Sequence, residues 1–276
     1  MTGAPRAPVD LPELLRLGSR AAAEAARAVT ELTGGRRPLR TKSSPTDPVT
    51  AADVASDAAL RARLVTERPY DGLLSEDGED IASRNGVRWV ADPLDGTVNH
   101  LHGIPHVAVS IACEVWTEGA WQAVIGVVHD VVRGHQFTAV RGGGSHRDGT
   151  ALSVTDPVSR AQAVLVTEFD YLPAARRRQA AQIARIAPEV ADIRATGSSA
   201  LDLCWLAAGW VDGYFEDELA RWDWAAGRLI VEEAGGVVTD FGTGVLAAGP
   251  QLHSSLRVLL TPGPPPSRSL PPVRHG

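Results

Sequence analysis

Residues 89–99 read Trp89-Val-Ala-Asp-Pro-Leu-Asp-Gly-Thr-Val-Asn99, a stretch that places two carboxylates at the end of an apolar segment. Its first residues predict a buried strand, and the proline and glycine predict a turn directly after it. Asp92 and Asp95 are therefore expected close together, which is costly unless a cation neutralises them. Carboxylate, hydroxyl and backbone carbonyl oxygens are the ligands that Mg²⁺ prefers. Taken alone, the stretch also fits an ordinary Asp-Pro turn followed by an Asp-Gly turn.

The composition indicates a folded acidic protein. The chain has 276 residues, enough for one large domain or two fused layers with a sizeable core. Apolar residues make up 44%, charged residues 22%, and the formal net charge is −6, which favours neither a disordered chain nor a nucleic-acid partner. Lys42 is the one lysine beside 26 arginines, so a specific role is expected for it.

The cysteines and the N-terminus bear on the compartment. Cys113 and Cys204 lie far apart in apolar runs, without a partner at zinc-ligand spacing, which favours reduced thiols in the cytosol. The first ten residues lack the pattern of a signal peptide, and no apolar run reaches the ~18 residues of a membrane span. We therefore expect a cytoplasmic protein without a membrane partner.

Hydrophobic periodicity predicts alternating helices and strands. Helices are expected over 11–32, 50–66, 172–186, 198–208 and 222–234. Strands are expected over 72–75, 87–91, 107–115, 123–128, 136–140, 163–167, 193–195, 213–216, 237–239 and 257–260. The glycine-rich segment 141–149 is interpreted as a hairpin loop without a binding role, and the proline-rich tail 262–276 as disordered. The pattern indicates sheets layered with helices.

Carboxylates also begin or end three further predicted elements. Asp53 lies three residues after Thr50, which fits a capping box at a helix start. Glu76 and Asp77 follow an apolar strand directly, and Asp223 opens the last predicted helix. Each acid alone has an ordinary interpretation as a helix cap or a solvated turn.

Together and in this order, these blocks resemble the inositol monophosphatase family of magnesium-dependent, lithium-sensitive phosphatases. The resemblance covers the chain from about residue 10 to residue 260. Its matching blocks are KSSPTDPVTAAD (42–53), LLSEDG (73–78), WVADPLDGTVNHLHGIPHVAVSIA (89–112), ATGSSALDLCWLAAGWVDGYFE (195–216) and WDWAAGRLIVEEAGG (222–236).

The resemblance implies an α/β (α+β) fold with layered αβαβα architecture, a mainly antiparallel N-terminal sheet and a mixed C-terminal sheet. It implies an N-terminal α+β half at 10–150 with most metal ligands and a C-terminal α/β half at 151–261 with the substrate-binding residues. Members of the family are usually dimers, so a homodimer is expected on resemblance alone.

The resemblance also implies two or three Mg²⁺ ions in the active site. The implied ligands are the carboxylates of Glu76, Asp92, Asp95 and Asp223 and the backbone carbonyl of Leu94. Thr97, paired with Glu76, matches the group that orients the attacking water. Asp53 matches the acid near the loosest metal, and Lys42 matches the lysine of the mobile loop that closes over the site.

Further matching positions imply contacts with the substrate. They are Asp95, Gly96, Thr97, Gly197, Ser198, Ser199, Glu216 and Asp223. The amides of Gly96 and Thr97 are expected to meet the phosphate at a helix start. Glu216 matches the acid that contacts substrate hydroxyls, which suits a polyol such as inositol 1-phosphate.

Two positions depart from the family pattern. Asp77 stands where a second glutamate is usual, and His100 stands where phenylalanine is common. His100 joins His102 and His106 near the expected edge of the site. These histidines are interpreted either as neutral surface residues or as groups that help to grip an anionic substrate.

The implied activity is hydrolysis of a phosphate monoester by in-line attack of water, with inositol 1-phosphate as the first candidate. Alternatives with the same chemistry are histidinol phosphate, fructose 1,6-bisphosphate, 3′-phosphoadenosine 5′-phosphate, NADP, and a sugar or aminocyclitol phosphate. A regulatory binding protein without activity is a more remote alternative. Such a protein should have lost a ligand acid, and all five matched acids are present.

Overall fold

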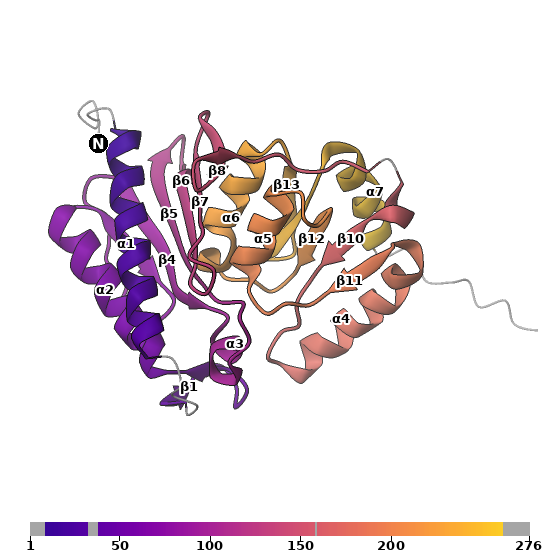
Figure 1. Cartoon of the computed structure of the whole chain (residues 1–276), viewed down its shortest axis with the longest axis horizontal. Helices are drawn as coiled ribbons and strands as arrows, with labels where there is room; N and C mark the ends of the chain where they lie inside the picture. Colours follow the sequence, from indigo (N-terminus) through magenta and orange to yellow (C-terminus); the bar gives the residue numbers. More distant parts are fainter. Residues whose placement is uncertain (1–8, 33–37, 158, 262–276) are drawn as a thin grey trace, which may run out of the picture.

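The computed structural model describes residues 9–32, 38–157 and 159–261. Within them, helices and sheets alternate in five layers: a helix pair, a sheet, a second helix pair, a second sheet and a third helix pair (Figure 1). This confirms the predicted αβαβα architecture. The tail predicted to be disordered, 262–276, lies outside the described residues.

The larger sheet carries the first half of the site. Its strands, in spatial order, are β3 (Gly72–Ser75), β4 (Val87–Asp95), β5 (Ala108–Thr117), β6 (Ala120–Asp130), β7 (Gln136–Val140), β8 (Gly144–Arg147) and β9 (Thr150–Ala151). β3 runs parallel to β4, and the other neighbours are antiparallel, as predicted. Helices cover both faces of β4, so Trp89 and Val90 are both buried although they point to opposite faces.

The outer helices α1 (Leu11–Glu31) and α2 (Ala51–Glu67) cover one face of this sheet. The Asp10 side chain begins α1 by accepting the Glu13 N–H at 3.1 Å. Leu14, Leu17 and Ala21 then form a buried stripe at helical spacing that packs on the sheet. The apolar period of the sequence thus specifies which side of α1 is buried.

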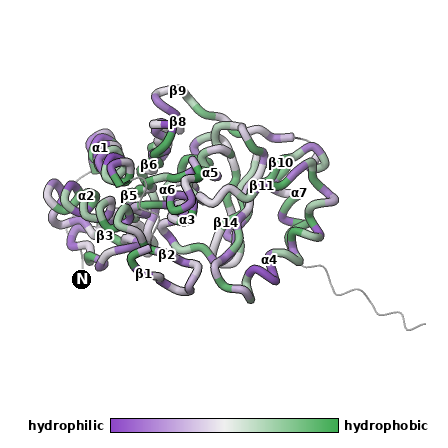
Figure 2. The backbone as a smooth tube through the Cα atoms, turned by 60° about the horizontal axis from the view of Figure 1, so that its bottom comes forward, coloured by the Kyte–Doolittle hydropathy of each residue, from purple (hydrophilic) through white to green (hydrophobic). Residues whose placement is uncertain are grey.

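The second sheet is mixed, also as predicted. Its strands, in spatial order, are β11 (Asp192–Arg194), β10 (Val164–Val166), β12 (Gly213–Glu216), β14 (Gly244–Ala248) and β13 (Val237–Phe241). β10 is parallel to both of its neighbours, whereas β14 is antiparallel to both of its own. Helices α4 (Pro173–Ile186) and α7 (Pro250–Leu260) cover its outer face, and α4 includes strongly hydrophilic residues (Figure 2).

Helices α5 (Ser199–Ala207) and α6 (Arg221–Glu233) fill the layer between the sheets. One hydrophobic cluster joins Val90 of the first sheet, Leu203 and Leu229 of these helices, and Tyr214 of the second sheet. This shared core brings the end of β4 together with the end of β12 and the start of α6, which lie more than 100 residues further along the chain. The division into two halves at residues 150 and 151 stays a prediction.

Short elements complete the described chain. They are β1 (Arg40–Thr41), β2 (Pro48–Val49), α3 (Thr97–His102) and the single-turn helices η1 (Arg160–Gln162) and η2 (Ala187–Glu189). β1 pairs with β2 in a small antiparallel sheet near α3 (Figure 1). No described helix is long and apolar enough to cross a bilayer.

Two local predictions were wrong, and one strand was missed. The strand predicted at 257–260 is the last turn of α7, where Leu252, Leu256 and Leu260 are buried at a four-residue spacing that a short window misses. The loop predicted at 141–149 contains β8, because Gly144–Arg147 pairs with β7 despite its glycine-rich context. Strand β14 was not predicted; its five residues are all buried.

Candidate active site

Strand β4 ends with Asp92 and Asp95 at the wall of a cleft. Its pairing with β5 is regular up to Asp92 and resumes at Asp95, so the residues between them leave the ladder as a bulge. The Leu94 N–H donates to Asp92 Oδ1 at 3.0 Å, and the Ser56 hydroxyl donates to the Pro93 carbonyl at 2.6 Å. The bulge therefore aims both carboxylates into the cleft while its polar groups stay bonded.

The start of α5 holds Asp95 from the opposite half of the chain. The Ser198 hydroxyl and the Ala200 N–H both donate to Asp95 Oδ2, at 2.6 Å and 2.8 Å. Ser198, predicted to contact the substrate, is only 1% exposed and lies behind the wall of the cleft. It thus orients a carboxylate that faces the cleft.

Lys42 reaches the acids that follow β3. Its Nζ lies 2.7 Å from Glu76 Oε1 and 3.0 Å from Asp77 Oδ1. Burial opposes the charged ammonium, but the two carboxylates outweigh burial and raise the pKa of Lys42. The single lysine of the chain is therefore a fixed positive charge at the edge of the cleft, in agreement with the specific role expected for it.

The first turn of α6 contributes Asp223. Its Oδ2 accepts the Ala220 N–H at 2.7 Å, so the side chain caps the helix and also faces the cleft. The interpretation as a helix-capping residue is thus confirmed, and the role of Asp223 as a metal ligand stays a prediction.

Thr97 and Asp53 form a buried pair. The Thr97 hydroxyl lies 2.8 Å from Asp53 Oδ1, while Asp53 Oδ2 accepts the Thr50 N–H at 2.7 Å in the predicted capping box. Among the described residues, the carboxylate that binds the Thr97 hydroxyl is therefore Asp53 and not Glu76. Because Asp53 is fully buried, it does not line the cleft itself.

The cleft has a volume of about 580 Å³ and gathers most of the predicted site residues. Those that line it are Lys42, Glu76, Asp92, Leu94, Asp95, Gly96, Thr97, Gly197, Ser199, Glu216 and Asp223. Tyr171 and Leu172, just before α4, lie on the opposite wall.

Burial and mutual repulsion make the carboxylates of the cleft reluctant to ionise. Desolvation raises the pKa of Glu76 and of Asp95 to about 6 each. Desolvation, together with the charges of Glu76 and Asp95, raises the pKa of Asp92 and of Asp223 well above the usual range. Such a set of buried acids favours a bound cation, and its donors are all oxygens, as Mg²⁺ requires.

The side chains of the described residues do not yet converge as a metal cage. No group of three or more histidine, cysteine, aspartate or glutamate side chains among them is placed to hold an ion. The Lys42 ammonium instead occupies the space between Glu76 and Asp77. The donor chemistry of the cleft thus fits a hard cation.

Two glycines allow the backbone to close around the site. Gly96 and Gly197 have φ angles of +93° and +88°, in the left-handed region that favours glycine. A Cβ on Gly96 would lie 2.9 Å from the His106 carbonyl oxygen, and one on Gly197 would lie 2.7 Å from Asn99 Nδ2. The two loops therefore touch only because neither position carries a side chain.

Glu216, at the end of β12, also lines the cleft. Its Oε2 accepts hydrogen bonds from the Ser199 hydroxyl at 3.0 Å and from the Tyr214 hydroxyl. Burial raises the pKa of Glu216 well above its usual range. This carboxyl is thus held by two hydroxyl groups of the protein, and its contact with substrate hydroxyls stays a prediction.

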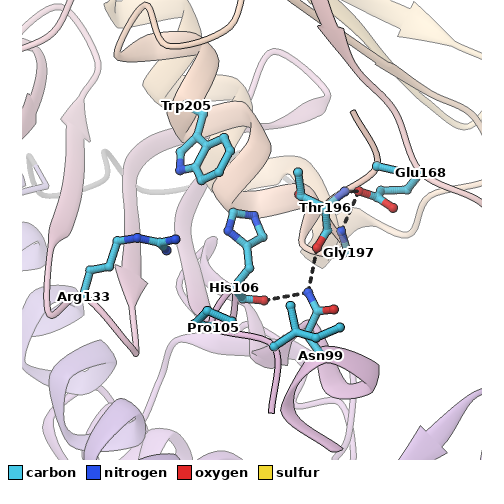
Figure 3. Close-up of a pocket in the computed structure, with 10 residues that line it drawn as sticks. Asn99, Pro105, His106, Arg133, Glu168, Thr196, Gly197 and Trp205 are labelled. Atoms are coloured by element: carbon cyan, nitrogen blue, oxygen red, sulfur yellow. Dashed lines mark hydrogen bonds between the residues drawn. The ribbon is translucent and has the colours of Figure 1, made fainter. Parts of the chain in front are cut away.

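A second cavity, of about 470 Å³, adjoins the cleft and shares Asn99, Glu168 and Gly197 with it. Figure 3 shows the His106 ring beside Trp205, with Asn99 between the two loops. The Asn99 amide donates to the carbonyls of His106 and Thr196, at 2.8 Å and 2.7 Å. The side chain therefore ties the β4 end to the α5 start.

The histidines differ in placement. His106 is buried, with its ring centroid 4.6 Å from that of Trp205, so the interpretation as a surface residue is wrong for it. His102 is exposed and His100 is half-buried. None of the three lines the cleft, although the His106 Nε2 lies 3.3 Å from the buried Asp202.

Glu168 was missed by the sequence reasoning. Its Oε1 accepts the N–H groups of Thr196 and Gly197, the latter at 2.6 Å, and it borders both cavities (Figure 3). It follows the apolar strand predicted at 163–167, the same acid-after-strand pattern that drew attention to Glu76. Desolvation and the charge of Asp202 raise its pKa to about 8.

We expect Glu168→Gln to weaken the pH dependence of stability in the metal-free protein. The folded pKa of about 8 exceeds the ordinary 4.5, so the folded state keeps a proton that the unfolded chain has lost between these values. The unfolding free energy of the wild type should therefore fall as pH rises through this window, by on the order of 2 kcal/mol. Glutamine cannot titrate but still offers an oxygen to both N–H groups.

Denaturant unfolding in EDTA at several pH values measures this difference. Glu189→Gln is the matched control, because Glu189 is paired only with Arg160 at the surface. Parallel pH profiles for the wild type and Glu168→Gln would contradict the assignment of the proton to this carboxyl.

Comparison with known proteins places this fold and site in one class. The sequence profile of the inositol monophosphatase family matches residues 10–267, and the chain belongs to this family. It is therefore a phosphatase that hydrolyses phosphoric monoesters, and the family is generally metal-dependent.

Proteins with similar sequences carry two different names, inositol-1-monophosphatase and Nus factor SuhB. The chain is 44% identical over 211 residues to an inositol-1-monophosphatase of Mycobacterium leprae, which covers 72% of this chain and 70% of that protein. It is 39% identical to the Nus factor SuhB of Pasteurella multocida, over 84% of this chain and 86% of that protein.

A solved structure agrees in fold. The extragenic suppressor protein suhB from Bartonella henselae superposes with a TM-score of 0.84 at 34% identity, over 91% of this chain and 99% of that one. The layers described above are thus those of an experimentally determined relative.

Proposed function

We propose that this protein is a Mg²⁺-dependent, lithium-sensitive inositol-1-phosphate phosphatase, which converts myo-inositol phosphate and water to myo-inositol and phosphate. The observation that carries the proposal is the meeting of two groups in one cleft. The buried acids Asp92, Asp95 and Asp223 line the same cleft as the hydroxyl-bonded carboxyl of Glu216. The first set suits the metal and phosphate, and the second suits the polyol.

We assign the carboxylates of Glu76, Asp92, Asp95 and Asp223 and the carbonyl of Leu94 as ligands for two or three Mg²⁺ ions. When bound, the ions would neutralise the phosphate, acidify a water molecule and stabilise the leaving oxygen. Lys42 pairs with Oε1 of Glu76, and we assign the other carboxylate oxygen, Oε2, to the metal. The Lys42 ammonium, which lines the cleft, is the proposed contact for the anionic substrate.

The buried pair of Asp53 and Thr97 supports the proposed water-orienting role. The Thr97 hydroxyl donates a hydrogen bond to the Asp53 carboxylate, which leaves the hydroxyl oxygen free to accept a hydrogen bond from a water molecule in the cleft. That water is thereby positioned with its lone pair directed toward the bound phosphate. The backbone of Gly96 and Thr97 is the proposed contact for the phosphate oxygens.

We expect Glu216→Gln to lower kcat/KM for inositol 1-phosphate by roughly ten-fold or more, because the amide NH₂ that replaces one carboxyl oxygen cannot accept a hydrogen bond from a substrate hydroxyl. Hydrolysis of p-nitrophenyl phosphate, whose leaving group has no such hydroxyls, should change by less than about three-fold. Steady-state phosphate release from both esters gives the comparison. Equal losses on both esters would assign Glu216 to the shared chemistry instead.

A substrate panel tests the polyol assignment directly. Inositol 1-phosphate should be preferred over histidinol phosphate, fructose 1,6-bisphosphate and 3′-phosphoadenosine 5′-phosphate in the presence of Mg²⁺, and lithium should inhibit the reaction. Activity confined to another ester would retain the metal site and overturn the inositol assignment. The homodimer and the cytoplasmic location stay parts of this proposal and need sedimentation and fractionation measurements.

A further inference from the structure

A cavity of about 260 Å³ between β6, the end of β7 and α6 is separate from the cleft. Arg141, Arg221 and Arg228 line it, together with the Trp224 ring. Among the described residues that line it, Glu232 is the one acid, while Glu114 and Asp240 pair with Arg221 and Arg228 from outside the lining. From this arrangement we propose that the cavity is a second anion-binding site, for a phosphate group.

The arginines are fixed in place before any ligand arrives. Arg221 is paired with Glu114, which is fully buried beneath it. Arg228 bonds Glu232 through Nε at 2.9 Å, and Arg141 bonds the Ala123 carbonyl through Nε at 2.7 Å. Because their positions are already set, little side-chain freedom is lost when they bind an anion.

Each guanidinium keeps one donor group for a ligand. Within the described chain, Nη1 of Arg141, Nη1 of Arg221 and Nη2 of Arg228 make no hydrogen bond. None of them is among the buried unpaired nitrogens of the described residues, so they stay accessible. Three such groups around one cavity match the several acceptor oxygens of a phosphate.

The Trp224 ring gives the cavity a rigid floor. The Arg221 and Arg228 guanidinium carbons lie 4.5 Å and 5.6 Å from its ring centroid, which holds both groups by cation–π attraction. The cavity is somewhat smaller than the range of about 300–1,000 Å³ typical of sites for drug-sized ligands. A free phosphate ion or the phosphate of a small metabolite fits this size and charge.

The cavity and the cleft share one helical turn. Arg221 and Trp224 line the cavity, whereas Trp222 and Asp223, between them in sequence, line the cleft. A ligand on Arg221 therefore lies two residues from a carboxylate of the active site.

Isothermal titration of inorganic phosphate into the EDTA-treated protein tests the site. Without metal, the acids of the cleft repel phosphate, so the arginine cavity should account for one bound ion per chain. Arg228→Ala and Arg141→Ala should each weaken this binding by about ten-fold. Arg177→Ala, which removes an exposed arginine of α4, should leave it unchanged. Thermal unfolding midpoints of the variants verify that they are folded.

Parallel titration with glucose 6-phosphate distinguishes a free ion from a phosphate ester as the ligand. Binding of either one that is lost in both cavity variants supports the proposal. It is overturned if the metal-free wild type binds neither ligand at millimolar concentration, or if binding survives in Arg228→Ala and Arg141→Ala. An equal loss in Arg177→Ala would also overturn it, since that result would reflect overall charge alone.

Discussion

Asp95→Asn is expected to lower kcat/KM for phosphate release by about 10³-fold or more, with little change in fold. The carboxylate faces the cleft, and its Oδ2 accepts hydrogen bonds from Ser198 and Ala200. An asparagine oxygen can accept the same two bonds, so the start of α5 stays attached to the end of β4. The variant lacks a negatively charged oxygen to bind the cation, so we expect it to lose catalytic activity and to keep its fold.

Steady-state kinetics over a range of Mg²⁺ concentrations measures the effect. Asp240→Asn serves as the control, because Asp240 is exposed on β13 and bonds only Arg228 among the described residues. Near wild-type activity in Asp95→Asn at saturating Mg²⁺ would contradict the ligand role. A cooperative unfolding transition close to that of the wild type would show that the loss does not arise from misfolding.

Removal of divalent cations with EDTA is expected to abolish phosphate release, and added Mg²⁺ should restore it. Without cations, buried carboxylates face one another in the cleft and repel the phosphate of the substrate. Mg²⁺ should also raise the unfolding temperature, because it binds the folded site and has no comparable site in the unfolded chain. Differential scanning calorimetry with and without Mg²⁺ measures this second effect.

Measurements of activity and of circular dichroism together distinguish loss of the metal from loss of the fold. Circular dichroism should show native helix content in EDTA, since the described core consists of apolar contacts between helices and sheets. Ca²⁺ provides a matched ion, because it binds oxygen ligands at longer distances and should not restore activity fully. Undiminished activity in EDTA would contradict a metal-dependent mechanism for this chain.

Most of the fold follows from local patterns in the sequence. The stripe Leu14, Leu17 and Ala21 predicted α1, and the apolar run before Asp92 predicted β4. Failures occurred where a short segment has no pattern of its own. Residues 144–147 form a strand because β7 offers a pairing edge, and residues 257–260 continue a helix whose apolar spacing is visible only from Leu252 onward.

The features of the site also divide into those that the sequence predicted and those that only the structure revealed. The acids at the ends of elements could be selected from the sequence because carboxylates after apolar strands or at helix starts are conspicuous. The residues that these acids contact could not be selected from the sequence. That Thr97 bonds Asp53, that Ser198 lies behind Asp95, and that His106 is buried against Trp205 depends on which loops meet in space.

By itself, the sequence determined the elements and the chemical character of the site, because periodicity and turn residues act over a few positions and carboxylates bind hard cations in any context. The tertiary structure decided which acids share one cleft and which arginines share one cavity. Asp95 and Ser198 are 103 residues apart, and Arg141 and Glu232 are 91 apart. Contacts over such separations follow from the packing of α5 and α6 between two sheets, which sets their geometry through burial of the shared core.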